Sequence, residues 1–136
     1  MITLYILPGG TKEERERAIA SFRTVEIAVK FIPMDCFNLY GPDEHGNDWF
    51  AFLYGYEFLD NNLREVLPLI TQVKDYAFFI FMKRFIFKGE ENISQAPRLF
   101  QRKVIMQPDC LMPVDLTLPW ERILDGWVTQ DAVLQI

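Results

Sequence analysis

The sequence has few of the residues on which metal sites and nucleic-acid binding depend. It contains one histidine, and its two cysteines, Cys36 and Cys110, lie far apart, so the close Cys and His spacing of a zinc site is lacking. We expect two separate buried thiols, and a disulfide between them is the alternative. Lys and Arg (14) are outnumbered by Asp and Glu (19), and the resulting net charge of −5 argues against nucleic-acid binding and against docking to anionic lipid.

Long apolar segments are lacking as well. The longest apolar run, Tyr76–Met82, is too short to span a bilayer, and Met1–Leu7 is too short for a signal peptide and has no basic region before it. We therefore predict a cytoplasmic protein without membrane association. What the chain does contain is hydrophobic residues, which make up 50% of its 136 residues and include 12 phenylalanines. This composition predicts one globular domain, residues 1–136, with an aromatic core.

The amino-terminal segment has the pattern of a strand, a helix and a second strand. Residues 2–7 are largely apolar, β-branched or aromatic, and this run ends at Pro8-Gly9-Gly10. Residues 11–22 begin with the Thr-x-x-Glu spacing of a capping box, which predicts a helix. Residues 25–31 alternate in part between apolar and polar side chains and predict the second strand. A unit of this kind favours a parallel pair of strands.

The middle of the chain predicts a loop, a central strand and a helix. Residues 33–48 are rich in Pro, Gly, Asn and Asp, as is typical of a loop. Trp49–Leu53 is apolar at every position, which is typical of a strand that is covered on both faces. Asp60-Asn61-Asn62 precedes an apolar stripe that predicts a helix over 63–73, and Pro68 is expected to kink or split that helix.

The last part of the chain predicts further strands. Residues 76–87 form a long aromatic strand or hairpin arm, and a turn or mobile loop is expected over 88–96. A strand is predicted within 97–106 and a short helix near 120–124. Taken together, these elements predict an α/β fold: a single domain with a mixed, mostly parallel sheet and flanking helices.

The segment from Trp49 to Glu57 carries a family resemblance. Its sequence, Trp-Phe-Ala-Phe-Leu-Tyr-Gly-Tyr-Glu, resembles the strand and metal-site segment of family 2 glycosyltransferases, whose usual form is Trp, four apolar residues and then Asp-x-Asp-Glu. Tyr54 and Tyr56 stand where that family has its two aspartates. Farther along, Arg98-Leu99-Phe100-Gln101-Arg102 is similar to the family's Arg-Leu-Phe-x-Arg element, so the resemblance extends from Trp49 to Arg102.

The resemblance implies a reduced nucleotide-diphosphosugar transferase (GT-A) fold. In that family the two aspartates bind the divalent cation that carries the diphosphate of the donor, and a protonated phenol is a poor ligand for such a cation. We therefore expect a degenerate relative, a pseudoenzyme with no metal site, no cofactor and no metal-dependent transfer, that retains at most weak binding of a sugar nucleotide or glycan. The resemblance places that binding site at Pro8, Gly9, Gly10, Glu57, Arg98 and Arg102.

The chain also departs from the family pattern. Pro8-Gly9-Gly10 stands where the family has an Asn-Glu pair, and only the predicted loop 33–48 lies between the second strand and Trp49. A helix and a strand that would line the nucleotide pocket are therefore missing. No motif singles out a catalytic base, for which Asp109 and Asp115 are the candidates.

Most of these site residues also have a simpler structural interpretation. Pro8-Gly9-Gly10 has the composition of a bare turn, and Arg98 and Arg102 have the positions of partners in structural salt bridges. Lys83 and Arg84, flanked by aromatic residues, are expected where a strand meets solvent. His45 lies in an acidic loop that could hold a metal ion, but its neighbours are ordinary turn residues.

Two further functions follow from the same residues. The first is a non-catalytic interaction or assembly module, a homo-oligomer or a binder of another protein, that uses the aromatic residues of 76–87 if some of them point outward. The second is a metal-independent glycosyltransferase in which Arg98, Arg102 or Lys83 replaces the cation, because basic side chains also stabilise a departing diphosphate.

Overall fold

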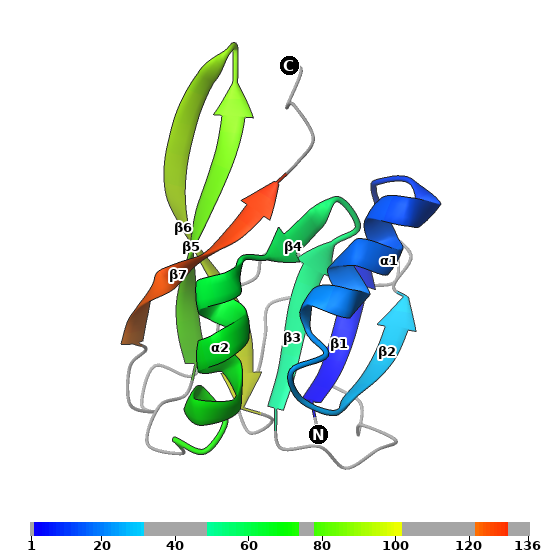
Figure 1. The fold of residues 1–136 in the computed structure, drawn as a ribbon, viewed down its shortest axis with the longest axis vertical. Helices are drawn as coiled ribbons and strands as arrows, with labels where there is room; N and C mark the ends of the chain where they lie inside the picture. The colour runs from blue at the N-terminus through cyan, green and yellow to red at the C-terminus, as the bar shows by residue number, and fades with distance from the viewer. Residues whose placement is uncertain (1, 32–48, 74–77, 102–121, 131–136) are drawn as a thin grey trace.

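The computed structural model describes residues 2–31, 49–73, 78–101 and 122–130, which form a mixed α/β domain (Figure 1). Its strands and helices follow one another along the chain in the order β1 (Ile2–Leu7), α1 (Lys12–Ser21), β2 (Ile27–Phe31), β3 (Trp49–Tyr54), β4 (Glu57–Leu59), α2 (Asn61–Ile70), β5 (Phe78–Phe87), β6 (Glu90–Gln101) and β7 (Arg122–Gln130). The predicted loop over 33–48 lies outside the described residues.

The predicted strand–helix–strand unit at the start of the chain is confirmed. β1 pairs in parallel with β2 on one side and with β3 on the other, so that Ile2 lies between Ile27 and Trp49. The capping box of α1 is present, because the Glu14 amide donates to Thr11 Oγ1 at 3.1 Å and the Thr11 amide donates to Glu14 Oε1 at 2.8 Å. The sequence pattern thus predicts the start of α1 and the parallel pairing of β1 with β2, whereas the pairing of β1 with β3 is seen only in the structure.

The described strands form one sheet in the order β2-β1-β3-β6-β5-β7-β4. The pairs β1–β2, β1–β3 and β5–β7 are parallel, whereas β3–β6, β5–β6 and β4–β7 are antiparallel. The expectation of a mixed sheet is therefore confirmed, but the expectation of a mostly parallel one is wrong. The physical reason is the β5–β6 hairpin, since two strands joined by a two-residue turn are necessarily antiparallel.

Residues 88–96 do not form the loop that the sequence predicts. Lys88 and Gly89 alone make the turn, with φ angles of 51° and 77°, and the chain is a strand again from Glu90. Positive φ at both turn residues is the geometry of a two-residue type I′ hairpin, whose twist matches that of the flanking strands. The polar residues after the turn are therefore part of a strand because they pair with β5, and not because of their own β-strand propensity.

The carboxy-terminal prediction is also wrong for the residues that the structure describes. The helix expected near 120–124 is replaced from Arg122 onward by β7, which pairs in parallel with β5 and antiparallel with β4. The short strand β4 was itself not predicted, since no element was expected between the strand Trp49–Leu53 and the helix 63–73. β4 and β7 are thus distant in the sequence but pair with each other in the sheet.

α2 is a single helix that Pro68 does not split. Asp60 is its N-cap, with Oδ1 accepting from the Leu63 amide at 3.0 Å, and the helix ends at Ile70, two residues after Pro68. Proline lacks the amide hydrogen that would bond the carbonyl of Arg64, and its effect is reduced because it lies in the last turn. The helix is therefore displaced toward the amino terminus relative to the predicted 63–73.

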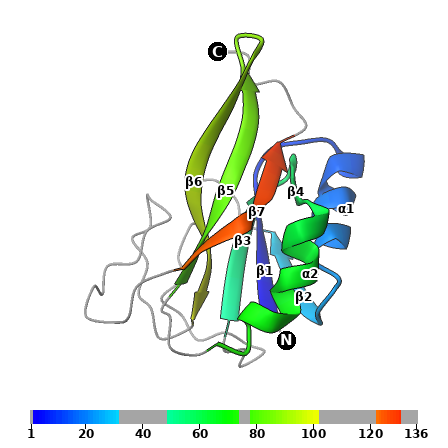
Figure 2. The same ribbon diagram turned by 60° about the vertical axis from the view of Figure 1, so that its left-hand side comes forward.

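Both helices cover the same face of the sheet (Figure 2). The core on that face joins strand residues to Phe22, the C-cap residue of α1, and to Leu63 and Leu67 of α2. A second, aromatic cluster occupies the other face and contains Leu7, Phe50, Phe52, Phe78, Ile80 and Phe100. The prediction of an aromatic core is confirmed, because Phe22, Phe52, Phe79, Phe81 and Phe100 are all fully buried. No described helix is long and apolar enough to cross a membrane.

Candidate functional site

The segments 8–10 and 54–57, which the sequence assigns to one site, lie next to each other. β1 and β3 are parallel neighbours in a register that pairs Leu7 with Tyr54, so both strands end at the same edge of the sheet. The Gly55 amide donates to the Leu7 carbonyl at 3.2 Å and joins the two turns. In sheets of this kind, ligands bind outside the carboxyl ends of parallel strands, and this edge is therefore the natural place for a site.

The two turns pack so closely that only glycine fits between them. A Cβ on Gly9 would lie 2.9 Å from Cδ1 and Cε1 of Tyr56, and a Cβ on Gly10 would lie 2.7 Å from the Gly55 carbonyl. A Cβ on Gly55 would overlap the Gly9 carbonyl oxygen. The Tyr56 ring thus lies against the glycine turn, at the amino-terminal end of α1.

Side chains of the protein itself form hydrogen bonds with the backbone at and next to the start of α1. Thr11 and Glu14 form the capping box, and Arg15 Nη1 donates to the Gly10 carbonyl at 2.8 Å. Arg17 extends from the same helix and donates to the Tyr56 carbonyl at 3.3 Å. These contacts fit the simpler interpretation of Pro8-Gly9-Gly10, a turn between strand and helix.

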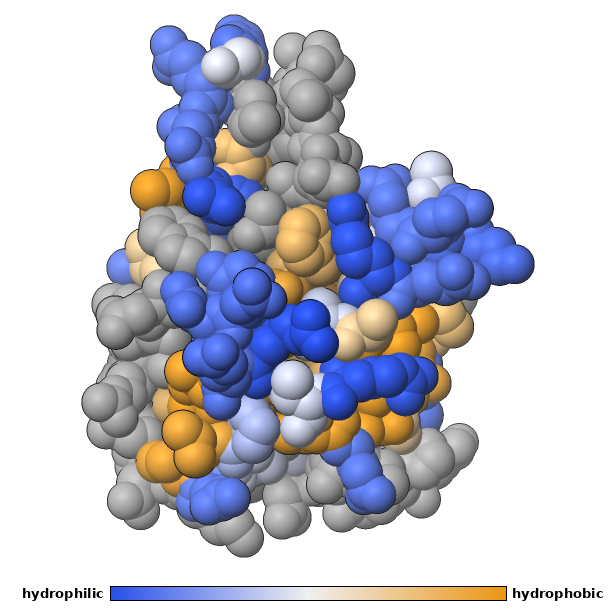
Figure 3. All heavy atoms as spheres, in the orientation of Figure 1, coloured by the Kyte–Doolittle hydropathy of each residue, from blue (hydrophilic) through white to orange (hydrophobic). Residues whose placement is uncertain are grey.

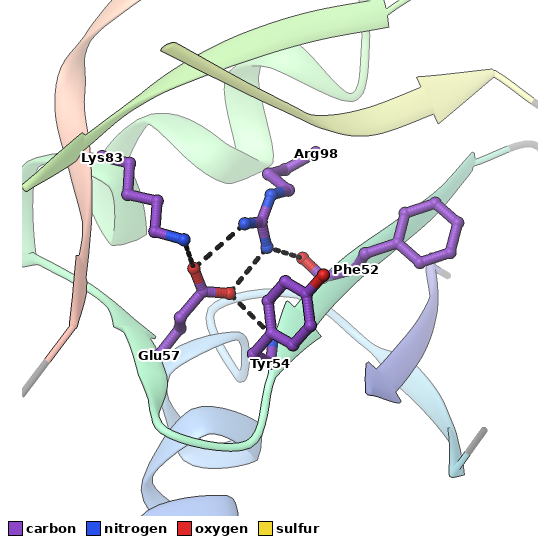
Figure 4. Close-up of polar contacts among 5 residues, drawn as sticks. All are labelled: Phe52, Tyr54, Glu57, Lys83 and Arg98. Carbon is purple, nitrogen blue, oxygen red and sulfur yellow. Dashed lines mark hydrogen bonds and ion pairs between the residues drawn. The ribbon is translucent and has the colours of Figure 1, made fainter. Parts of the chain in front are cut away.

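Glu57 is the centre of a buried ion network (Figure 4). Its carboxylate is fully buried and accepts a bidentate pair of hydrogen bonds from Arg98, with Nη1 2.6 Å from Oε1 and Nη2 3.0 Å from Oε2. Lys83 Nζ lies 3.0 Å from Oε2, and the Tyr54 amide donates to Oε1 at 2.7 Å. Arg98 also lies 3.5 Å from the Phe52 carbonyl. Each carboxylate oxygen therefore has two partners.

Opposing effects set the charge state of Glu57. Burial alone would raise the pKa of its carboxyl, because a charge is poorly solvated there. The positive charges of Arg98 and Lys83, together with hydrogen bonds from Arg98 and the Tyr54 amide, outweigh burial and hold that pKa below its ordinary value. Glu57 is therefore a carboxylate at neutral pH, already neutralised by two side chains of its own protein.

The tyrosines at the two motif positions extend this network outward. The rings of Tyr54 and Tyr56 are stacked, with centroids 5.7 Å apart and planes 9° apart. Arg98 Cζ lies 5.3 Å and Lys83 Nζ 5.6 Å from the centroid of the Tyr54 ring, which places both cations within reach of its π electrons. The cluster holds two cations and one carboxylate, and the Tyr54 ring compensates part of the excess positive charge.

A divalent cation does not fit these residues. The only motif carboxylate, Glu57, has both oxygens engaged by Arg98, Lys83 and the Tyr54 amide, so a cation there would meet two positive side chains. Among the described residues, no group of three or more His, Cys, Asp or Glu side chains could hold a metal ion. The chemistry available at this edge is that of arginine, lysine and tyrosine.

The structure corrects one prediction at this site and supports another. Lys83 does not sit at a solvent-facing strand end, because its side chain is 15% exposed and paired with Glu57, whereas Arg84 is 47% exposed and pairs with Glu91 at 3.3 Å. Arg98 makes the structural salt bridge that was its simpler interpretation. Arg102, His45, Asp109 and Asp115 lie outside the described residues.

Sequence reasoning missed the role of Lys83, although a signal was present. Side chains alternate along a strand, so Lys83 shares the side of β5 that carries the buried residues Phe79 and Phe81. A lysine in such a position needs a buried partner. The identity of that partner, Glu57, follows only from the folded sheet.

No protein-family model and no curated protein sequence matches this chain. The likeness to family 2 glycosyltransferases therefore remains a prediction from the residues Trp49–Arg102.

Proposed function

We propose that this chain is a reduced, GT-A-like glycosyltransferase relative that does not carry out metal-dependent sugar transfer and that binds a sugar nucleotide or glycan weakly at the Tyr54–Glu57 edge. The observation that carries the proposal is the state of Glu57. The one acidic residue that matches the family motif is buried and held by Arg98 and Lys83. A diphosphate bound without a metal ion would have to use basic side chains instead.

The arrangement of the strands supports the same proposal. The segment that resembles the metal motif follows β3, a buried strand parallel to β1, and it faces the turn 8–10 at the carboxyl end of that neighbour. The stacked tyrosines occupy the positions at which the family has its two aspartates, and the Tyr56 ring lies against the turn 8–10. Rings packed in this way are compatible with weak, shallow binding and poorly suited to enclosing a donor sugar.

The experiment is an NMR titration of isotope-labelled protein with uridine and guanosine diphosphates, first in EDTA and then with Mg²⁺ or Mn²⁺. We expect amide shifts confined to residues 8–11 and 54–57 at ligand concentrations of about 1 mM, and the same shifts with and without the metal. Without nucleotide, paramagnetic Mn²⁺ should leave the amides of Tyr54 and Glu57 sharp. No shift with either nucleotide would refute the nucleotide-binding part of the proposal.

A variant that restores the family residues provides the positive control. Tyr54→Asp combined with Tyr56→Asp returns two carboxylates to the motif, and Mn²⁺ should broaden amides near position 55 in that variant. Shifts in the wild-type protein that require Mg²⁺ would contradict the loss of the cation site. The same spectra report whether the variant is folded.

A further inference from the structure

The β5–β6 hairpin extends beyond the rest of the sheet as an arm, defined here as residues 84–96 (Figures 1 and 2). β7 pairs with β5 only as far as Arg84, and β3 pairs with β6 only at 99–101. The two strands of the arm pair with each other up to Phe87 and Glu90. Its tip is hydrophilic on the face seen in Figure 3. A hairpin without neighbours is only marginally stable in water.

The outer edge of β6 has little protection against pairing with another strand. Among the described residues, no strand pairs with Glu90–Pro97 on the side away from β5. Proline and strand irregularities commonly block such edges, yet the first proline of β6 is Pro97, and the register shift in β5 lies at Phe79 and Ile80, near the base of the hairpin. Ile93, in the middle of this edge, is 56% exposed.

We propose that this edge pairs with the same edge of a second copy, antiparallel and centred on Ile93. In that register Ile93 lies opposite Ile93 of the second copy, which shields two exposed apolar side chains from water. Glu91 then lies opposite Gln95, and Glu90 opposite Ala96, so the pairing places no like charges face to face. A two-fold axis between the two copies of Ile93 makes the contact self-complementary and closed at two copies.

The charge of the arm also favours a second copy of the chain as its partner. Arg84 and Lys88 balance Glu90 and Glu91, so the arm is neutral although the whole chain carries a net charge of −5. Arg84 and Glu91 already form an ion pair within one arm. Two copies of an acidic protein that meet at the arm therefore bring together surfaces without net charge. This inference is independent of the proposed function, because the arm lies outside the Tyr54–Glu57 edge.

The first test is sedimentation velocity at protein concentrations from about 1 μM to about 1 mM, a range that covers weak self-association. We expect the wild-type chain to pass from monomer to dimer within this range. Ile93→Lys places like charges opposite each other and should remain monomeric. Leu69→Lys is the matched control, since Leu69 is 65% exposed on α2, away from the arm, and this variant should dimerise like the wild type.

Disulfide trapping tests the register. In a background of Cys36→Ser and Cys110→Ser, Ile93→Cys should form a covalent dimer on oxidation. Gln95→Cys should not, because the two copies of residue 95 would be offset by about 13 Å along the strands, too far for a disulfide. A wild-type chain that is monomeric throughout, a dimer that survives Ile93→Lys, or equal trapping at positions 93 and 95 would each overturn the proposal.

Discussion

Glu57 and Arg98, which are 41 residues apart in the sequence, form a buried bidentate ion pair. The pair joins β4 to β6, two strands that are not neighbours in the sheet order. Lys83 on β5 contributes a third charge, so one carboxylate connects three strands. Leu59, Phe81 and Leu99 of the same three strands lie in the apolar core, so the network adds charged contacts to apolar packing.

Removing one side chain of this network should lower the free energy of unfolding. Arg98→Met leaves the Glu57 carboxylate buried with Lys83 as its remaining charged partner, and we expect a loss of about 3–5 kcal/mol in the free energy of unfolding. Glu57→Gln combined with Lys83→Met and Arg98→Met removes all three charges of the network and keeps an acceptor for the Tyr54 amide. That triple variant should unfold at a higher urea concentration than Arg98→Met alone.

The exposed pair Arg84–Glu91 is the matched control for this measurement. Its side chains are 47% and 59% exposed, so Arg84→Met should cost less than about 1 kcal/mol. If Arg98→Met and Arg84→Met lost equal stability in urea unfolding, the Glu57 network would not have the structural role assigned to it.

The lowered pKa of Glu57 predicts a loss of stability in acid. Its folded-state pKa lies below the ordinary value of 4.5, so the unfolded chain binds more protons between these two values. The contribution of Glu57 is therefore complete above about pH 4.5 and is lost as the pH falls through the folded-state pKa. Urea unfolding between about pH 2.5 and about pH 7 should show this slope, which Glu57→Gln should reduce and Glu91→Gln should leave nearly unchanged. A slope that Glu57→Gln leaves intact would assign the acid sensitivity to other carboxyls.

The hydroxyl of Ser21 positions β4 and, with it, Glu57. Ser21 is buried at the end of α1, where its Oγ donates to the Ala18 carbonyl at 2.7 Å and accepts from the Leu59 amide at 3.1 Å. Ser21→Ala leaves the Leu59 amide without this partner, which should cost about 1–3 kcal/mol of stability and speed hydrogen exchange at that amide.

Thr71→Ala is the control for the Ser21 variant. The Thr71 hydroxyl donates to the carbonyls of Leu67 and Pro68 at a partly exposed helix end, where water replaces it, so this change should cost less than about 1 kcal/mol. Comparable losses in the two variants, or unchanged exchange at Leu59, would count against the link between α1 and β4.

The sequence predicted the elements whose signals are local. The apolar run of β3, the capping box of α1 and the Asp60 cap of α2 each follow from neighbouring residues, and each is present in the structure. The strand predicted within 97–106 is present as the last part of β6, whereas residues 90–96 of β6 and all of β7 were missed because their strand state depends on pairing with β5. Glu90–Gln95 is mostly polar and lacks the alternation of a half-buried strand.

The candidate site was predictable in part, for the same reason. The approach of 8–10 to Tyr54–Glu57 follows from two parallel strands that end at one edge. The closing of that edge by the Tyr56 ring and the neutralisation of Glu57 by Lys83 depend on contacts between residues distant in sequence. Neither contact leaves a spacing pattern in the sequence.

Two glycines with nearly the same φ angle allow the cost of close packing to be distinguished from the cost of backbone strain. Gly10 and Gly89 have φ angles of 76° and 77°, but a Cβ on Gly10 would lie 2.7 Å from the Gly55 backbone, whereas a Cβ on Gly89 meets nothing within 4 Å. Gly89→Ala should therefore cost only the strain of a left-handed residue, about 1–2 kcal/mol. Gly10→Ala should cost about 1–3 kcal/mol more, because the two turns must move apart. Urea unfolding of both variants measures this difference, and equal losses would mean that the turns at 8–10 and 54–57 do not pack as closely as the structure places them.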